Sequence, residues 1–152
     1  MEKQFEILKA NRTIILNILD DLTLTQVNRI PDGFRNNIIW NAAHLIVTQQ
    51  LLYYKLSGIA IGISDEMVFD YQKDTAPKKE ITLKEFEIIK KQLINLVDTS
   101  KGDYTNGVFS NYAGYQPSTA KVYLKTIEDA IQFNNFHEGM HLGYILALKN
   151  VL

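Results

Sequence analysis

The chain has 152 residues, a formal net charge of −1 and no cysteine. This length suits one domain with a core of its own, so we expect a single domain over residues 1–152. The lack of cysteine excludes disulfides, thiolate metal sites and a cysteine nucleophile. The lack of a basic stripe removes the charge needed to hold nucleic acid.

The N-terminal segment has neither the apolar stretch nor the small-residue cleavage site of a signal peptide. The most apolar part of the chain, residues 38–56, is interrupted by polar residues such as Asn41, His44 and Thr48. Such a segment is a poor candidate for a membrane span. We therefore expect a cytoplasmic protein that does not contact a membrane.

The first two predicted helices cover residues 3–22 and 36–56. In the first, apolar residues recur every three or four positions, which is the period of one helix face. The second follows the breaker sequence Pro31-Asp32-Gly33 and ends at Ser57-Gly58. Its predicted buried face reads Trp40, His44, Val47, Leu51 and Tyr54. This helix therefore carries the first of the three histidines.

The last two predicted helices begin at capping residues. Thr82 forms a capping-box pattern with Glu85, and Lys101-Gly102 is expected to end the third helix. Thr126 can cap the fourth helix, which then continues to the C-terminus. No segment alternates in the manner of a strand. Four amphipathic helices predict an all-α fold, a four-helix bundle, because each apolar face must pack against another.

Two connections are longer than the roughly two to eight residues that usually join helices in a bundle. Residues 58–81 could cross the length of the bundle and make the flanking helices parallel. Residues 102–118 are rich in glycine and tyrosine and are expected to fold over one end of the bundle. An aromatic plug on an apolar end is favoured there over a substrate lid. The aromatic side chains concerned are Tyr104, Phe109, Tyr112 and Tyr115.

All three histidines fall on predicted buried faces. His137 and His141 are four residues apart on the fourth helix, so both imidazoles project from one side, roughly 6 Å apart along the axis. His44 lies near the middle of the second helix and can face them. Three neutral imidazoles suit a divalent ion such as Zn²⁺ or Ni²⁺ and leave positions open for water or a substrate. We predict this metal site in preference to three hydrogen-bonded core histidines.

The segment from His137 to His141 also matches H-E-x-x-H, the motif of zinc proteases. In those enzymes the glutamate acts as a general base and a third metal ligand follows downstream. After His141 the chain has no acidic residue. The extended motif would need glycine and histidine where this chain has Tyr144 and Ala147. A protease is therefore disfavoured.

Three polar neighbours are weak candidates for assisting the site. Asn41 and Asn134 each precede a histidine by three residues on the same helix face, so either could orient water or an imidazole. Bonding to a neighbouring helix is slightly favoured for both. Glu138 could act as an acid or base, although a surface or interhelical carboxylate is at least as well supported. Gly143 is expected to allow close approach of another helix or of the metal ligands.

The second and fourth helices resemble those of the DinB-like superfamily. The shared marks are I-I-W-N-A-A-H-L, ending one residue after His44, and H-E-G-M-H-L-G, which starts at His137. The resemblance spans most of the chain and implies an up-down-down-up four-helix bundle with a long connection between helices two and three. It also implies that His44, His137 and His141 hold a divalent metal, often nickel or zinc, and that the protein forms homodimers.

For better-understood relatives, the resemblance implies attachment of a thiol such as bacillithiol, mycothiol or glutathione to an electrophile. We therefore expect a metal-dependent thiol S-transferase that acts on small molecules in stress response or detoxification. A metal with open positions can lower the pKa of such a thiol. The alternatives are a non-catalytic metal- or ligand-binding stress-response protein and, less favoured, a metal-dependent hydrolase. No obvious cluster of arginine or lysine accompanies the histidine-bearing helices to bind an acidic thiol.

Overall fold

The computed structural model describes residues 1–152 and is all-helical, which confirms the predicted class. The only β-type pairing is an isolated bridge between Tyr115 and Leu124. None of the helices is both long and apolar enough to cross a membrane. The α-helices are α1 (Glu2–Asp20), α2 (Leu24–Asn28), α3 (Ile38–Tyr53), α4 (Asp65–Tyr71), α5 (Leu83–Thr105) and α6 (Ile127–Lys149), and a short 3-10 helix, η1 (Lys55–Ser57), follows α3.

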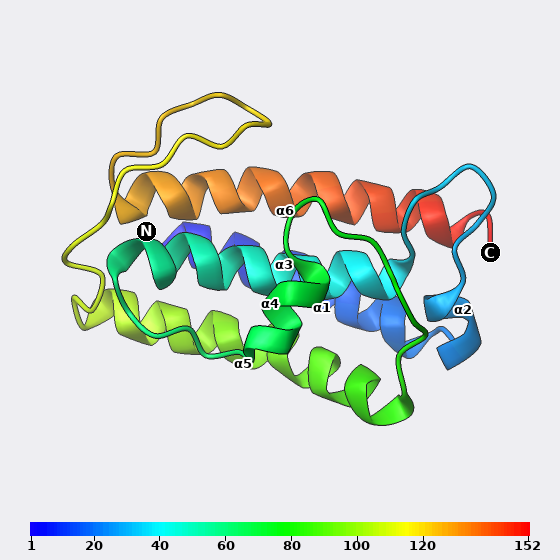
Figure 1. The fold of residues 1–152 in the computed structure, drawn as a ribbon. Coiled ribbons are helices and arrows are strands. Elements are labelled where there is room, and N and C mark those ends of the chain that lie inside the picture. The colour runs from blue at the N-terminus through cyan, green and yellow to red at the C-terminus, as the bar shows by residue number, and fades with distance from the viewer.

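The four long helices α1, α3, α5 and α6 lie side by side (Figure 1). Helix α3 packs against α5 and α6, and α1 packs against the same two helices from the other side. In the view of Figure 1, α1 and α6 run from left to right, whereas α3 and α5 run from right to left. The apolar core lies between these four helices.

Helix α3 is buried on all sides rather than along one face. Every residue from 38 to 47 is buried, because α3 also contacts α2 and α4 besides its two long neighbours. The prediction of a single buried stripe is therefore wrong for this helix. His44 is therefore buried although its helix has no single buried face.

The predicted helix starts at Thr82 and Thr126 are confirmed. The Thr82 hydroxyl accepts a hydrogen bond from the Glu85 amide, and the Glu85 carboxylate accepts one from the Thr82 amide. Thr126 and Asp129 form the same reciprocal pair at the start of α6. Each pair satisfies amide groups that have no partner within the helix.

The predicted end of the third helix at Lys101-Gly102 is wrong, since α5 continues to Thr105. The residues after Gly102 are still held by the core. The Tyr104 ring lies 5.8 Å from that of Phe5 on α1, and Asp103 accepts a hydrogen bond of 2.5 Å from the Tyr54 hydroxyl. These contacts keep the last turn helical, and a single glycine costs too little to end it.

The two short helices α2 and α4 were not predicted, because five and seven residues are too few to show a helical period. Helix α4 lies within the predicted connection 58–81 and packs against α3. Ser64 caps it by accepting a hydrogen bond from the Met67 amide. Its last residue, Tyr71, places a backbone carbonyl beside His44.

The segment between α5 and α6 closes one end of the helices and then folds back along α6 (Figure 1). Phe109 is buried, with its ring edge-on to those of Tyr53 and Tyr54 at 6.2 and 5.0 Å. This part of the segment forms the expected aromatic plug. Tyr115 lies further along and belongs to the surroundings of the histidines.

Candidate metal centre

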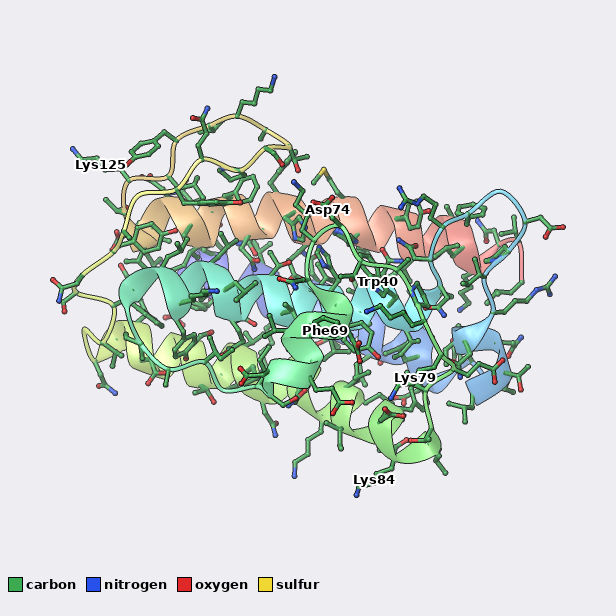
Figure 2. The ribbon with its side chains drawn as sticks, in the orientation of Figure 1. Trp40, Phe69, Asp74, Lys79, Lys84 and Lys125 are labelled. Atoms are coloured by element: carbon green, nitrogen blue, oxygen red, sulfur yellow. The ribbon has the colours of Figure 1, made fainter.

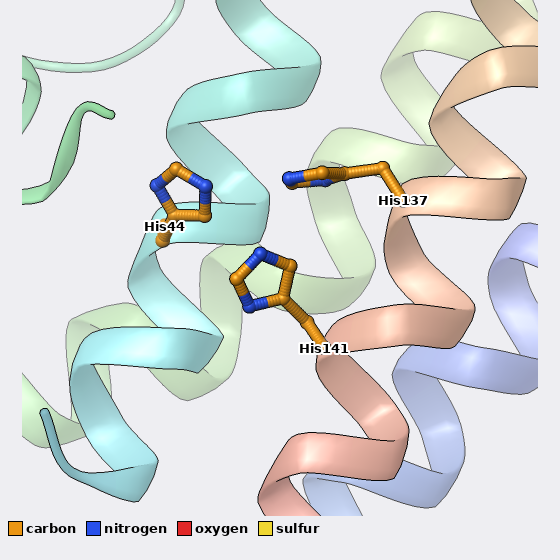
Figure 3. A group of neighbouring side chains, drawn as sticks. All are labelled: His44, His137 and His141. Carbon is orange, nitrogen blue, oxygen red and sulfur yellow. The ribbon is translucent and has the colours of Figure 1, made fainter. Parts of the chain in front are cut away.

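The three predicted histidines converge between α3 and α6. Figure 3 shows the ring of His44 on α3 facing those of His137 and His141 on α6. The ring centroids are 4.5 to 5.2 Å apart. One ligand nitrogen from each residue lies within 4.8 Å of the other two. The structure therefore brings together three nitrogen atoms that could hold one metal ion.

Hydrogen bonds fix the protonation of two of the imidazoles. The Nδ1 atom of His44 lies 2.7 Å from the backbone oxygen of Tyr71, and that of His141 lies 2.8 Å from Oδ1 of Asn41. A carbonyl oxygen only accepts, so both Nδ1 atoms carry a proton and both Nε2 atoms keep a lone pair. Metal-binding histidines are commonly oriented in this way. The only contact of the His44 Nε2 atom is a weak one, 3.3 Å from the Thr48 hydroxyl.

Asn41 is itself held in one orientation. Its Nδ2 group donates to the backbone oxygen of Asn37 at 2.8 Å and to Oδ1 of Asn36 at 2.9 Å. Its Oδ1 atom is therefore the one that faces His141. Asn41 therefore orients the imidazole of His141, which is one of the two roles predicted for this residue.

His137 is the least satisfied of the three. Its side chain is only 9 % exposed, and its Nδ1 atom has no hydrogen-bond partner. Buried polar atoms without a partner are rare in folded proteins, because they lose their contacts with water and gain none in return. His137 is therefore the imidazole with a buried nitrogen that the protein leaves unpaired.

Burial keeps all three imidazoles neutral. It lowers the pKa of His137 to about 3, with further lowering from the neighbouring His141 and His44 and from Arg12. Burial and then the nearby His44 lower the pKa of His141 to about 4. Burial also lowers the pKa of His44. At neutral pH the lone pairs are therefore available to a cation, and three imidazoles without a carboxylate fit a borderline ion such as Zn²⁺ or Ni²⁺.

A cavity of about 410 Å³ opens beside the three histidines. Its inner wall is apolar and includes Trp40, whose ring stacks on that of His44 at 4.8 Å and 9°. Two loops form its outer wall, and Lys73 of one donates a 2.6 Å hydrogen bond to Ser118 of the other. Tyr115 also lines this wall, so the segment that plugs the helix end also borders the cavity. The remaining apolar lining residues are Leu51, Leu52, Leu56, Phe133 and Met140.

The other predicted neighbours, Asn134 and Glu138, make no hydrogen bond to the histidines. Asn134 is buried, but its only partner is Glu138, at 3.5 Å. The predicted close approach at Gly143 is wrong, because a Cβ atom at that position would meet nothing within 4 Å. Gly143 faces outward on α6, where a glycine is not needed for packing.

Glu138 is an interhelical carboxylate, one of the alternatives stated for it. Its side chain is fully buried and accepts hydrogen bonds of 2.6 to 2.9 Å from the guanidinium of Arg12 on α1. Sequence reasoning missed Arg12, although a signal was present. Arg12 stands four residues after Leu8 and three before Ile15, on the apolar face of α1, and a charge in such a place needs an acidic partner.

Comparison with curated proteins finds no match for this chain. The family model of the DinB superfamily matches residues 7–145. This range includes all three histidines and the whole of α3. The match covers most of the chain, in agreement with the resemblance of the two histidine-bearing helices. The chain belongs to the DinB superfamily.

Proposed function

We propose that this protein is a metal-dependent thiol S-transferase that joins a low-molecular-weight thiol to a small electrophile. Its main support is the orientation of the histidines. His44 and His141 commit Nδ1 to protein acceptors, and their Nε2 atoms have no protein partner beyond the weak contact of His44 with Thr48 at 3.3 Å. The group lies beside an apolar cavity of about 410 Å³, which is large enough for a small organic substrate.

The residues of the centre would hold Zn²⁺ or Ni²⁺ through three nitrogen atoms and leave further positions open. A divalent cation bound there would supply a Lewis acid that lowers the pKa of a coordinating thiol. Asn41 and the Tyr71 carbonyl hold two of the rings in place. Trp40 supports His44 from its other face.

The cavity wall would position the electrophile and exclude water from it, because its inner side chains are mostly apolar. With an alkyl halide as the electrophile, a carbon–sulfur bond forms and the carbon–halogen bond breaks. The halide leaves with the bonding electrons, and the thiol proton passes to solvent water. No oxidant or reductant is required for this transfer.

The same proposal includes three features of the whole protein. The helix directions seen in Figure 1 support an up-down-down-up four-helix bundle. We also propose that the protein acts in the cytoplasm and as a homodimer, as expected from the family resemblance. Light scattering of the purified protein would test the dimer, and a monomeric mass at micromolar concentration would contradict it.

The activity can be tested with zinc- or nickel-loaded protein, a panel of thiols and chlorobimane, which becomes fluorescent on conjugation. We expect faster conjugation with at least one thiol, and loss of the acceleration in His137→Ala. Gln132→Ala is a matched control, because Gln132 is exposed on the same helix and lines no cavity around the histidines. Rates equal to those of His137→Ala for every thiol would contradict the proposal. Retained zinc binding would then favour the non-catalytic metal-binding role.

A further inference from the structure

A second cavity reaches the histidine centre from another side. Its lining includes Arg35, Asn36, Asn41, Thr75 and Tyr144. It shares His141, Met140 and Asp74 with the apolar cavity. Figure 2 shows Asp74 at the tip of the segment that follows α4, next to α6. His141, one of the three histidines, therefore lines both cavities, and we call the second one the Arg35 groove.

The two cavities differ in chemical character. The apolar cavity takes its large side chains from leucine and aromatic residues, and its charged members are Lys55, Lys73 and Asp74. The Arg35 groove is lined mainly by carboxamides, a hydroxyl and charged groups, with Met140 and Tyr144 as its large less polar members. One cavity therefore suits an apolar molecule, and the other suits a polar one.

Arg35 provides an uncompensated positive charge in the groove. Its guanidinium has no ion-pair partner, and the only acidic residue in the groove, Asp74, already lies 3.7 Å from Lys73. A guanidinium binds a carboxylate through two parallel hydrogen bonds, which makes it selective for that group. The groove is therefore suited to an anionic ligand.

The loop that carries Arg35 is fixed relative to the centre. Asn37 caps α3 through the Trp40 amide at 2.9 Å and donates to the backbone oxygen of Asn28 at 2.8 Å. Asn36 accepts from Asn41, which in turn contacts His141. A chain of hydrogen bonds thus runs from the residue next to Arg35 to one of the three histidines.

The same loop is also attached to α6 by an aromatic contact. The ring of Phe34 lies edge-on to that of Tyr144, with centroids 5.6 Å apart. Because both flanking residues are anchored, the backbone at Arg35 has a set position beside the centre. The side chain remains exposed and free to reach a ligand.

We propose that the Arg35 groove binds the anionic end of the thiol substrate, while the apolar cavity binds the electrophile. This inference rests on the proposed thiol S-transferase function and names its substrate class, a thiol that carries a carboxylate. The two substrates approach the histidines from different sides, so each can bind without the other. The sulfur then forms its bond to carbon at the junction, the leaving group departs with the bonding electrons, and the thiol proton passes to water.

Calorimetric titration of the zinc-loaded protein tests this assignment without relying on turnover. The probes are 2-mercaptosuccinate, which carries two carboxylates, and 2-mercaptoethanol, which carries none. We expect Arg35→Gln to weaken binding of mercaptosuccinate about tenfold or more, as for loss of a charge-assisted pair of hydrogen bonds. Binding of mercaptoethanol should remain unchanged. Arg29→Gln is the matched control, because Arg29 is exposed near the same loop and lines neither cavity.

Two outcomes would overturn the inference, and they differ. Equal affinities of the wild type and Arg35→Gln for mercaptosuccinate would remove the assignment of the groove and leave the thiol transferase proposal intact. Failure of both thiols to bind the zinc-loaded wild type at millimolar concentration would contradict the proposed function, and the assignment of the groove would fall with it. Thermal melting of Arg35→Gln verifies that the variant is folded.

Discussion

Two groups of buried polar side chains meet on adjacent residues of α6, and they are satisfied in opposite ways. Glu138 forms an ion pair with Arg12, with both side chains fully buried and hydrogen bonds of 2.6 to 2.9 Å. His137, one residue earlier, has an Nδ1 atom without any partner and faces two other imidazoles. The charges of the first group cancel within the protein, although Nη1 of Arg12 has no hydrogen-bond partner, whereas the second group is uncharged and has no acidic partner.

This difference suits the first group to a structural role and the second to binding a cation. A buried charge needs an opposite charge, and the Arg12–Glu138 pair supplies it while joining α1 to α6. Neutral imidazoles need no such charge, and three of them that converge without a carboxylate leave room for a cation. Stability measurements should therefore respond to the ion pair in the absence of metal and to the histidines in its presence.

The largest expected effect comes from breaking the ion pair on one side. Glu138→Leu leaves the Arg12 charge buried without a partner, so we expect the free energy of unfolding to fall by about 3–5 kcal/mol. The double variant Arg12→Met/Glu138→Leu should recover most of this loss, because no unpaired charge remains. Urea denaturation of metal-free protein measures both. A double variant less stable than Glu138→Leu would show that the ion pair stabilises the fold by more than the cancellation of its two charges.

The next effect concerns metal binding at the histidines. Zinc at a hundred times its dissociation constant should raise the free energy of unfolding by about 2.7 kcal/mol. His137→Leu should abolish this gain and leave the metal-free protein at least as stable, since the unpartnered Nδ1 atom is removed. Thermal melting with zinc or with a chelator checks both statements. A strongly destabilised metal-free His137→Leu would indicate a structural histidine.

The histidine centre could be predicted from the sequence because its determinants are local. His137 and His141 lie four residues apart on one helix. The start of that helix is specified by Thr126 and Asp129, which lie within a single turn. His44 required one further inference, that its helix faces the last one. Side-chain spacing was sufficient for the pair on α6, whereas the position of His44 opposite them depends on the packing of α3 against α6.

The surroundings of the centre could not be predicted, because they depend on contacts between distant residues or on the backbone. Arg12 and Glu138 are 126 positions apart, and nothing local links them. The acceptor for His44 is a backbone oxygen of α4, which no side-chain pattern reveals. Arg35 stands alone in a loop, so it forms no basic cluster in the sequence, yet folding places it in the lining of a cavity that also includes His141.

Asn41 offers a smaller and more specific test of the open group. Asn41→Ala removes the acceptor that orients His141, and loss of such an outer hydrogen bond commonly weakens metal binding by about 10–100-fold. Asn134→Ala is the comparison, because Asn134 occupies the equivalent place before His137 but bonds Glu138 instead. Competition with a chromogenic chelator gives both affinities. Equal weakening by the two variants would contradict the assignment of Asn41 to His141.

The last prediction concerns the stability of the metal-free protein against pH. Burial lowers the pKa of His137 from its ordinary value of 6.5 to about 3. Between these two pH values, the unfolded chain binds a proton at this imidazole and the folded chain does not. Stability should therefore fall as the pH decreases below about 6.5, by about 1.4 kcal/mol per pH unit for this imidazole.

Carboxylates also titrate at low pH, so the contribution of His137 is best isolated by difference. Between about pH 6 and pH 4.5, His137→Leu should show a slope of stability against pH that is shallower by about 1.4 kcal/mol per pH unit. Urea denaturation across this range, with a chelator present, measures the difference. Equal slopes would mean that His137 takes up its proton as easily in the folded state as in the unfolded one, which would require the imidazole to be hydrated or paired. In that case the two groups on α6 would both be satisfied internally, and the contrast between a closed ion pair and three imidazoles that could hold a cation would be lost.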